Sequence, residues 1–484
     1  MDEKRSLPLE MVSASKWSLL SEAASKAVTP LAFLILARLL DPSSFGIFAL
    51  ATLAITFAQI LWDSGLSKAL VQREGNPHDA ANVVFFANVA LGLFMYLLIL
   101  VFAQEIAELL GDVRLETILR VQGLQMVTGS AASVQSALLQ RHMDFKALFR
   151  ARMLTILVGS ATALSLAGLG YGYWALVGGI LVGDVARAAY LWILSPWRPQ
   201  WRFDLALARE LWAFGGWILL EELLAWFIVW GDSTFVGIYL GAHDLGIYRT
   251  GSLIVNMTLS TLLEPLVPVT FSGLSRIQAE RKRFNAYVDR VTRLFGVIAL
   301  PLGASLLALR QPIVDIVLGE RWDGIQPVIG AFAIATGLSY TLSAFPPAFR
   351  ASGRAKAFAT LRVLSVCYIL PVYIFSIQAG LLAFLYARIG VTVLTMLLYA
   401  FTVNHCFQYG FMSFFRSFAS GLFGAFCLWG ITVILTHLFG QGLLPWHQVF
   451  VVLLLLMGMG LHLLLVSKDR FFFRQIVHLS FGKL

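Results

Sequence analysis

The chain has 484 residues, of which 58% are hydrophobic and 13% are charged, and its mean hydropathy is +0.78. Soluble domains carry about 25% charged residues, so this composition excludes a soluble enzyme or binding domain and indicates a polytopic membrane protein. The net charge of +9 does not indicate nucleic-acid binding, because the basic residues lie in short segments between apolar runs. Cys367, Cys406 and Cys427 show neither a disulfide spacing nor a metal-ligand spacing.

Fourteen apolar runs, each long enough to cross a bilayer, follow one another along the chain. The first contains Lys26 and lacks a cleavage site, so we interpret it as a membrane span and not as a signal peptide. The sequence therefore predicts an all-α integral membrane protein with about 14 transmembrane helices. The predicted spans are residues 15–38, 44–66, 80–104, 114–137, 150–169, 172–194, 211–231, 247–270, 287–310, 324–348, 357–378, 381–403, 414–438 and 446–466.

The distribution of basic residues predicts the orientation of these spans. With the N-terminus in the cytoplasm, 27 of the 36 Lys and Arg residues fall on the inside, six on the outside and three within spans. Cytoplasmic segments carry an excess of Lys and Arg, so we expect both termini of this multi-pass protein to be cytoplasmic.

An internal repeat divides the chain. Residues 38–48 recur at 238–248, and each copy reads as a tight hairpin between two membrane helices. Two further matches follow in the same order at an offset of 208. A repeat of this length predicts two pseudo-symmetric six-helix lobes related by an axis along the membrane normal. The matched residues are Leu40, Gly46, Ile47 and Phe48 with Leu240, Gly246, Ile247 and Tyr248; Gly65 to Lys68 with Gly273 to Arg276; and Gly172 and Ala175 with Gly380 and Ala383.

The repeat also predicts the limits of four regions. We expect a cytoplasmic N-terminus at residues 1–13, an N-lobe of helices 1–6 at 14–205, and a C-lobe of helices 7–12 at 206–404. Residues 405–484 hold helices 13 and 14, outside the repeat, and a cytoplasmic C-terminus.

Four segments resemble the polysaccharide transport family of Wzx-type flippases, in the multidrug, oligosaccharidyl-lipid and polysaccharide exporter superfamily. They are residues 36–48, 170–176, 231–241 and 318–322. The resemblance implies that the lobes form a V around a cavity in the bacterial inner membrane. The implied cargo is an oligosaccharide on undecaprenyl pyrophosphate, for lipopolysaccharide O-antigen, exopolysaccharide or capsule. Implied partners are membrane lipids, a polysaccharide polymerase and a chain-length regulator. The predicted helices 13 and 14 resemble the extra helix pair of the lipid II flippase branch.

Basic residues inside spans are candidates for binding the cargo, because a charge at the bilayer centre costs roughly 2.5–3.5 kcal/mol. Lys26, Arg187 and Arg388 lie within spans, and Arg249 lies at an outer helix end. The alternative is local ion pairing, of Lys26 with Glu22 and of Arg187 with Asp184. We favour cargo binding for Lys26 and the ion pair for Arg187, and leave both open for Arg388.

Acidic residues in the seventh span are candidates for ion coupling. Glu221 and Glu222 are mid-span without an evident partner, so protonation of either would suit an antiporter. Asp232, at the outer end, lies near where related lipid II flippases place a sodium ligand, although a cap or outer-mouth charge explains it equally well. We expect no cofactor or metal other than coupled H⁺ or Na⁺.

Three alternative functions stay in view. The mid-span acids also suit a multidrug exporter of organic cations, whereas the basic residues in spans do not. A polysaccharide polymerase or ligase would need a sizeable outer loop, and the sequence contains no catalytic constellation, so we do not expect an enzyme. A passive scaffold would have no need of intramembrane charges.

Overall fold

The computed structural model describes residues 3–63, 65–73, 77–201 and 204–439, and within them the regular structure is entirely helical. The chain divides into two compact units, Met1–Arg249 and Thr250–Leu484. This division falls inside one long helix, α9 (Leu205–Leu263), whereas the lobe boundary expected from the repeat lies at its start. The predicted region limits therefore stay predictions.

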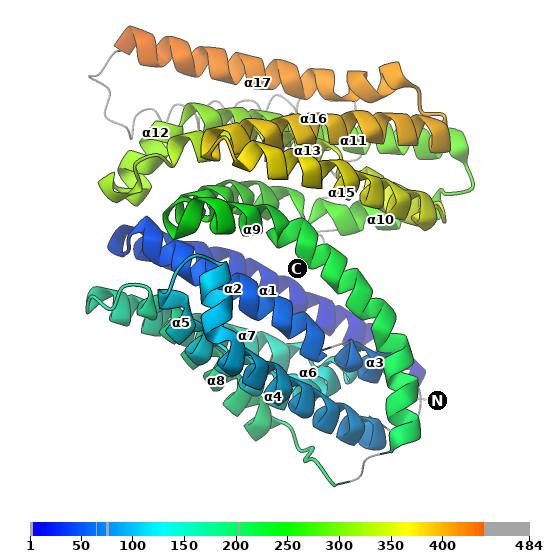
Figure 1. The fold of residues 1–484 in the computed structure, drawn as a ribbon. Coiled ribbons are helices and arrows are strands. Elements are labelled where there is room, and N and C mark those ends of the chain that lie inside the picture. The colour runs from blue at the N-terminus through cyan, green and yellow to red at the C-terminus, as the bar shows by residue number, and fades with distance from the viewer. Residues whose placement is uncertain (1–2, 64, 74–76, 202–203, 440–484) are drawn as a thin grey trace. The chain divides into compact units, whose positions relative to one another are not determined.

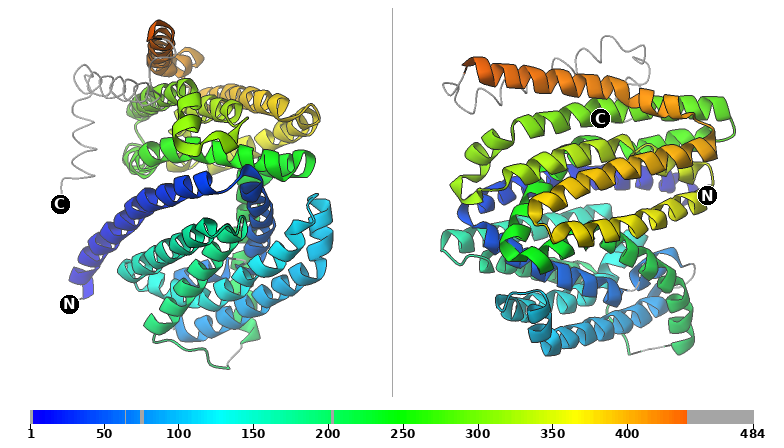
Figure 2. Two further views of the ribbon diagram at one scale, coloured as in Figure 1. Left: turned by 90° about the vertical axis from the view of Figure 1, so that its left-hand side faces the viewer. Right: turned by 45° about the horizontal axis from the view of Figure 1, so that its top comes forward.

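In the first unit, the helices run side by side (Figures 1 and 2). Helix α7 packs against α1 and α8, and α6 packs against α4 and α8. Two short helices, α3 and α5, interrupt the pattern of long spans. The bounds are α1 Glu3–Leu39, α2 Pro42–Asp63, α3 Leu66–Gln72, α4 Pro77–Leu109, α5 Arg114–Gln122, α6 Leu124–Arg141, α7 Phe145–Gly168 and α8 Trp174–Leu194, followed by α9.

Each repeat copy contains an interruption of its helical backbone, and the two interruptions lie at equivalent positions. In the first copy, Asp41 separates α1 from α2, and its carboxylate accepts hydrogen bonds from the Ser44 backbone N–H at 2.8 Å and the Ser44 hydroxyl at 3.1 Å. Pro42 follows as the first helical residue, where its missing N–H costs nothing. In the second copy, Gly241 has φ 85° and ψ −178°, a conformation open to glycine, and it breaks α9 into two helices.

Close contact between α7 and α8 fixes the helix that carries Asp184 and Arg187. A Cβ on Gly159 would lie 2.9 Å from the Gly179 carbonyl oxygen, and a Cβ on Gly179 would lie 2.8 Å from the Gly159 carbonyl oxygen. Small residues let membrane helices approach until their backbones touch. This contact holds the two helices in one relative position.

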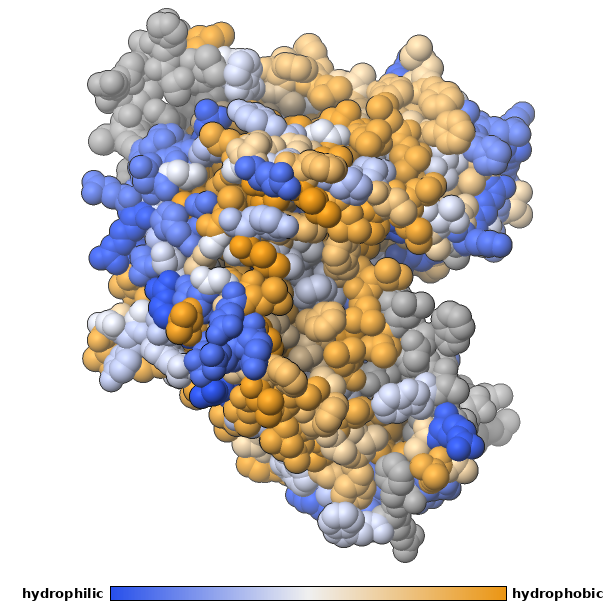
Figure 3. All heavy atoms as spheres, viewed as in Figure 1, coloured by the Kyte–Doolittle hydropathy of each residue, from blue (hydrophilic) through white to orange (hydrophobic). Residues whose placement is uncertain are grey.

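The second unit is built around α11, which lies between α13 and α17. Its core is rich in aromatic side chains, among them Phe284, Phe345, Phe349 and Phe414. On the face in Figure 3, hydrophobic side chains cover the middle of these helices and hydrophilic ones gather near both ends, as a bilayer requires. The bounds are α10 Leu266–Arg276, α11 Arg281–Ala308, α12 Arg310–Ile313, a π-helix Val314–Leu318, a 3₁₀-helix Glu320–Trp322, α13 Gln326–Thr341, α14 Phe345–Ala351, α15 Ala355–Ile377, α16 Leu381–Phe407 and α17 Phe411–Phe439.

Eleven of the described helices are long and apolar enough to cross a membrane, which confirms the predicted all-α, multi-pass class. The predicted fourth span is split at Gly123 into α5 and α6, and the seventh and eighth form one apolar stretch, Glu222–Leu263. The fourteenth span lies outside the described residues. The number of spans therefore stays a prediction.

Candidate functional site

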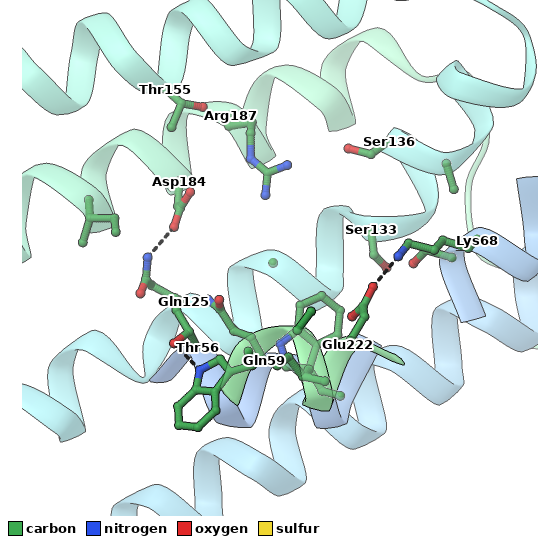
Figure 4. Close-up of a pocket in the computed structure, with 18 of the residues that line it drawn as sticks. Thr56, Gln59, Lys68, Gln125, Ser133, Ser136, Thr155, Asp184, Arg187 and Glu222 are labelled. Atoms are coloured by element: carbon green, nitrogen blue, oxygen red, sulfur yellow. Dashed lines mark hydrogen bonds and ion pairs between the residues drawn. The ribbon is translucent and has the colours of Figure 1, made fainter. Parts of the chain in front are cut away.

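A cavity of about 930 Å³ lies within the first unit, between α2, α3, α6, α7, α8 and the first part of α9 (Figure 4). Most of its side chains are polar, although it lies among membrane-spanning helices. Three tryptophans, Trp62, Trp226 and Trp230, also line it; Trp62 is buried, and the other two are partly exposed. The polar residues are Thr56, Gln59, Ser67, Lys68, Gln125, Ser133, Ser136, Gln140, Thr155, Asp184, Arg187 and Glu222.

An ion pair between Lys68 in α3 and Glu222 in α9 lines one side of the cavity (Figure 4). The carboxylate side chain is 28% exposed, so the pair is only partly shielded from solvent. The expectation that Glu222 has no partner was therefore wrong, because its partner lies 154 residues away. The Glu221 side chain lies outside the described residues.

On the opposite side, Asp184 accepts a hydrogen bond of 2.7 Å from the amide of Gln125. Gln125 in turn accepts a 3.5 Å bond from Gln122, which also donates to Thr52 at 3.2 Å. This chain of polar groups joins α8, α6, α5 and α2. The expected ion pair between Asp184 and Arg187 is not formed among the described residues, and the Arg187 guanidinium points into the cavity (Figure 4).

The Trp226 ring is held in place at the cavity by two contacts. Its indole N–H donates to the Thr56 hydroxyl at 3.1 Å. Its ring meets Phe57 edge to face, with centroids 5.1 Å apart. Both partners lie on α2, so this aromatic surface is positioned by the same helix that supplies Gln59.

Two predicted residues, Lys26 and Arg388, are not among the cavity-lining residues. The Lys26 ammonium lies 3.6 Å from the Glu22 carboxylate, which also lies 3.3 Å from the Arg152 guanidinium in α7. Arg388 belongs to the second unit, where its guanidinium lies 4.3 Å from the Phe332 ring centroid. Their roles in cargo binding stay predictions.

Arg249 and Asp232 lie together in α9, near the break at Gly241. The Arg249 guanidinium lies 4.0 Å from the centroid of Trp230, which itself lines the cavity. Asp232 accepts a 2.8 Å hydrogen bond from the Tyr248 hydroxyl. The described residues contain no group of three His, Cys, Asp or Glu side chains placed to hold a metal ion.

The polar stripe of α6 was not predicted from the sequence. Its cavity residues recur every three or four positions, so they share one helix face. That spacing, inside a predicted span, was a signal that could have found them. Lys68 was also overlooked as a site residue, although it ends the repeated Gly65 to Lys68 motif. The stripe consists of the polar residues Gln125, Ser133, Ser136 and Gln140, with Gly129 between them on the same face.

Apolar helices of this length around a cavity with many polar side chains define a multi-pass membrane protein with an internal polar site. The chain matches the family described as "Polysaccharide biosynthesis protein" over residues 35–327 and belongs to this family. It is 28% identical to the succinoglycan biosynthesis transport protein ExoT of Rhizobium meliloti, over 70% of this chain and 68% of that one. It is 22% identical to the lipopolysaccharide biosynthesis protein WzxC of Escherichia coli, over 67% of this chain and 66% of that one.

Solved structures confirm the fold. The lipid II flippase MurJ, in an inward closed conformation, superimposes with a TM-score of 0.73 at 13% identity, covering 96% of this chain and 100% of that one. An inward-facing multidrug transporter of the MATE family gives a TM-score of 0.57 at 15% identity, covering 81% and 95%. The family, its transport relative ExoT and the flippase fold identify the chain as a transporter and not as a polymerase or ligase, and they give the multidrug alternative less support.

Proposed function

We propose that this protein is a flippase that moves undecaprenyl-pyrophosphate-linked oligosaccharide units across the bacterial inner membrane. Such units serve lipopolysaccharide, exopolysaccharide or capsule biosynthesis. Family membership and the relative WzxC support the pathway, and the name of the relative ExoT supports transport as the step. The excess of basic residues in the predicted inner segments supports cytoplasmic termini.

The observation that carries the proposal is the polar cavity among membrane-spanning helices. A polar head group cannot cross the hydrocarbon core without partners for its hydrogen-bonding groups. The cavity offers amide, hydroxyl and charged side chains from six helices, whereas the hydrocarbon core of a bilayer offers none. Alternating access to such a site would let the head group cross while the polyprenyl chain stays in lipid.

An ion gradient is the energy source that we propose for this cycle. Glu222 is the coupling candidate, because protonation of its carboxylate would remove the charge that attracts Lys68. Release of the pair would remove this polar link between α3 and α9. Glu221 and Asp232 stay further candidates, and a polymerase and a chain-length regulator are proposed as partners in the membrane.

The test is complementation in the native host with the gene deleted. We expect the deletion strain to lose surface polysaccharide and to accumulate the lipid-linked unit on the cytoplasmic face, and a plasmid copy to reverse both effects. Export that continues without the gene, with no accumulated precursor, would refute the proposal. Efflux of cationic dyes, measured in the same strains, would support the multidrug alternative instead.

A further inference from the structure

We infer that the cavity of the first unit is a subsite for the sugar part of the cargo and not for its pyrophosphate. This inference rests on the proposed function and assigns the cavity to one portion of the substrate. It uses three observations: the charge balance of the cavity, its open hydrogen-bonding groups and its aromatic surfaces.

The ionised groups of the cavity balance one another. Lys68 and Arg187 are cationic, Asp184 and Glu222 are anionic, and Lys68 already pairs with Glu222. A pyrophosphate carries several negative charges and would meet two carboxylates here. Like charges in a partly buried site repel strongly. The cavity therefore favours an uncharged group with many hydrogen-bonding positions over a polyanion.

Three cavity side chains hold hydrogen-bonding groups that are open to a ligand. Gln59 in α2, Ser136 in α6 and Arg187 in α8 make no side-chain hydrogen bond among the described residues, and each lines the cavity (Figure 4). An amide and a hydroxyl each donate and accept, and a guanidinium donates through five N–H groups. Sugar hydroxyls also donate and accept, so these three helices present matching partners around one volume.

The aromatic surfaces and the size of the cavity fit the same ligand. The C–H face of a pyranose ring is apolar, and the partly exposed Trp226 supplies a planar apolar surface beside the amides and hydroxyls. Because the Trp226 N–H is engaged by Thr56, that ring does not need a polar partner from the ligand. The volume of about 930 Å³ falls within the roughly 300–1,000 Å³ typical of small-molecule pockets.

The experiment measures binding to the full-length protein in nanodiscs with two probes. One is undecaprenyl pyrophosphate, which has no sugar, and the other is the lipid-linked unit extracted from the deletion strain. We expect the double variant Gln59→Ala/Ser136→Ala to bind the glycosylated probe about tenfold more weakly and the bare carrier as wild type does. Gln104→Ala, an exposed amide in α4 outside the cavity, is the matched control and should change neither affinity.

A second pair of variants separates hydroxyl recognition from recognition of charge. Arg187→Gln keeps hydrogen-bond donors and should retain most of the affinity for the glycosylated probe, whereas Arg187→Ala should lose it. Three outcomes would overturn the sugar subsite. The two Arg187 variants could lose the same affinity for the glycosylated probe, or the double variant could bind that probe as wild type does. The double variant could also lose affinity for both probes in parallel. A wild-type protein that binds neither probe would refute the proposed function itself and the subsite with it.

Discussion

Gly46 in α2 packs directly against Gly246 in α9, and the two residues hold the same position in the two repeat copies. A Cβ on Gly46 would lie 1.6 Å from the Ala242 carbonyl oxygen, and a Cβ on Gly246 would lie 1.8 Å from the Pro42 carbonyl oxygen. The side chains of Ser43 and His243, also 200 residues apart, approach to 3.5 Å. Equivalent residues of the two copies therefore face each other across one helix crossing, with a local two-fold relationship between them.

Gly46→Ala should destabilise the protein. The added methyl group would overlap a backbone oxygen, which cannot rotate away, so the helices must separate. Overpacking of this kind lowers the free energy of unfolding by about 1–3 kcal/mol. Because the Cβ would come so close to a backbone oxygen, we expect a value at the upper end of this range. Thermal unfolding of the detergent-solubilised protein measures the effect. Gly168→Ala is the control, because a Cβ there meets nothing within 4 Å; equal melting temperatures for both variants would contradict the proposed crossing.

Removal of the ion pair between Lys68 and Glu222 should affect transport more than stability. Lys68 is 57% exposed, and ion pairs as exposed as this one stabilise by about 1 kcal/mol or less. We expect Glu222→Gln to fold normally, to lose most export and to lose its response to an imposed pH gradient. The exchanged pair Lys68→Glu/Glu222→Lys should regain part of the export. Export by Glu222→Gln that still follows the pH gradient would exclude this carboxylate as the coupling group.

Lys26 should be essential for export if it contacts the cargo. We expect Lys26→Ala to abolish complementation at normal protein level and Lys26→Arg to keep part of it, because the charge survives. Glu22→Ala and Arg152→Ala remove the neighbours of this residue and should be milder. If all three alanine variants reduce export equally, Lys26 acts only as one member of a structural ion network.

The carboxyl group of Asp112 should make stability depend on pH. Burial by itself raises the pKa of this group, but the side chain and backbone N–H of Arg114 hydrogen-bond to it, and the net pKa lies below the usual value. Because the folded-state pKa is lower than the unfolded value of about 3.9, the ionised carboxylate stabilises the folded protein at pH values above about 3.9. This stabilisation is lost as the pH falls through the folded-state pKa.

The matching variant is Asp112→Asn. We expect it to unfold at a lower temperature than wild type at pH 7, by an amount that corresponds to about 1 kcal/mol or less because Arg114 is half exposed. The difference should shrink as the pH falls below about 4. Glu105→Gln, which changes an exposed acid in α4, should show no such difference at either pH. A constant difference across this range would mean that the ionised carboxylate is not the stabilising group.

Features that depend on neighbours along the chain could be predicted from the sequence. Apolar runs of fixed length predicted the spans, because the thickness of a bilayer sets the length of any helix that crosses it. The matches around Leu40 and Leu240 predicted the repeat, and both copies break their helix at the expected place, at Asp41 and Gly241. The family could also be predicted from the sequence, because the four segments that resemble it follow one another along the chain in the expected order.

The site was decided by contacts between residues far apart in the chain. Lys68 and Glu222 are 154 residues apart, and Gln125 and Asp184 are 59 apart. Spacing along one helix suggested that Asp184 pairs with Arg187, yet the packing of α8 against α6 places the Asp184 carboxylate beside the Gln125 amide instead. Periodicity assigns a residue to a face of its helix, but only the packing of that helix decides what the face meets. For that reason the tertiary structure alone brought Gln59, Ser136 and Arg187 around one cavity.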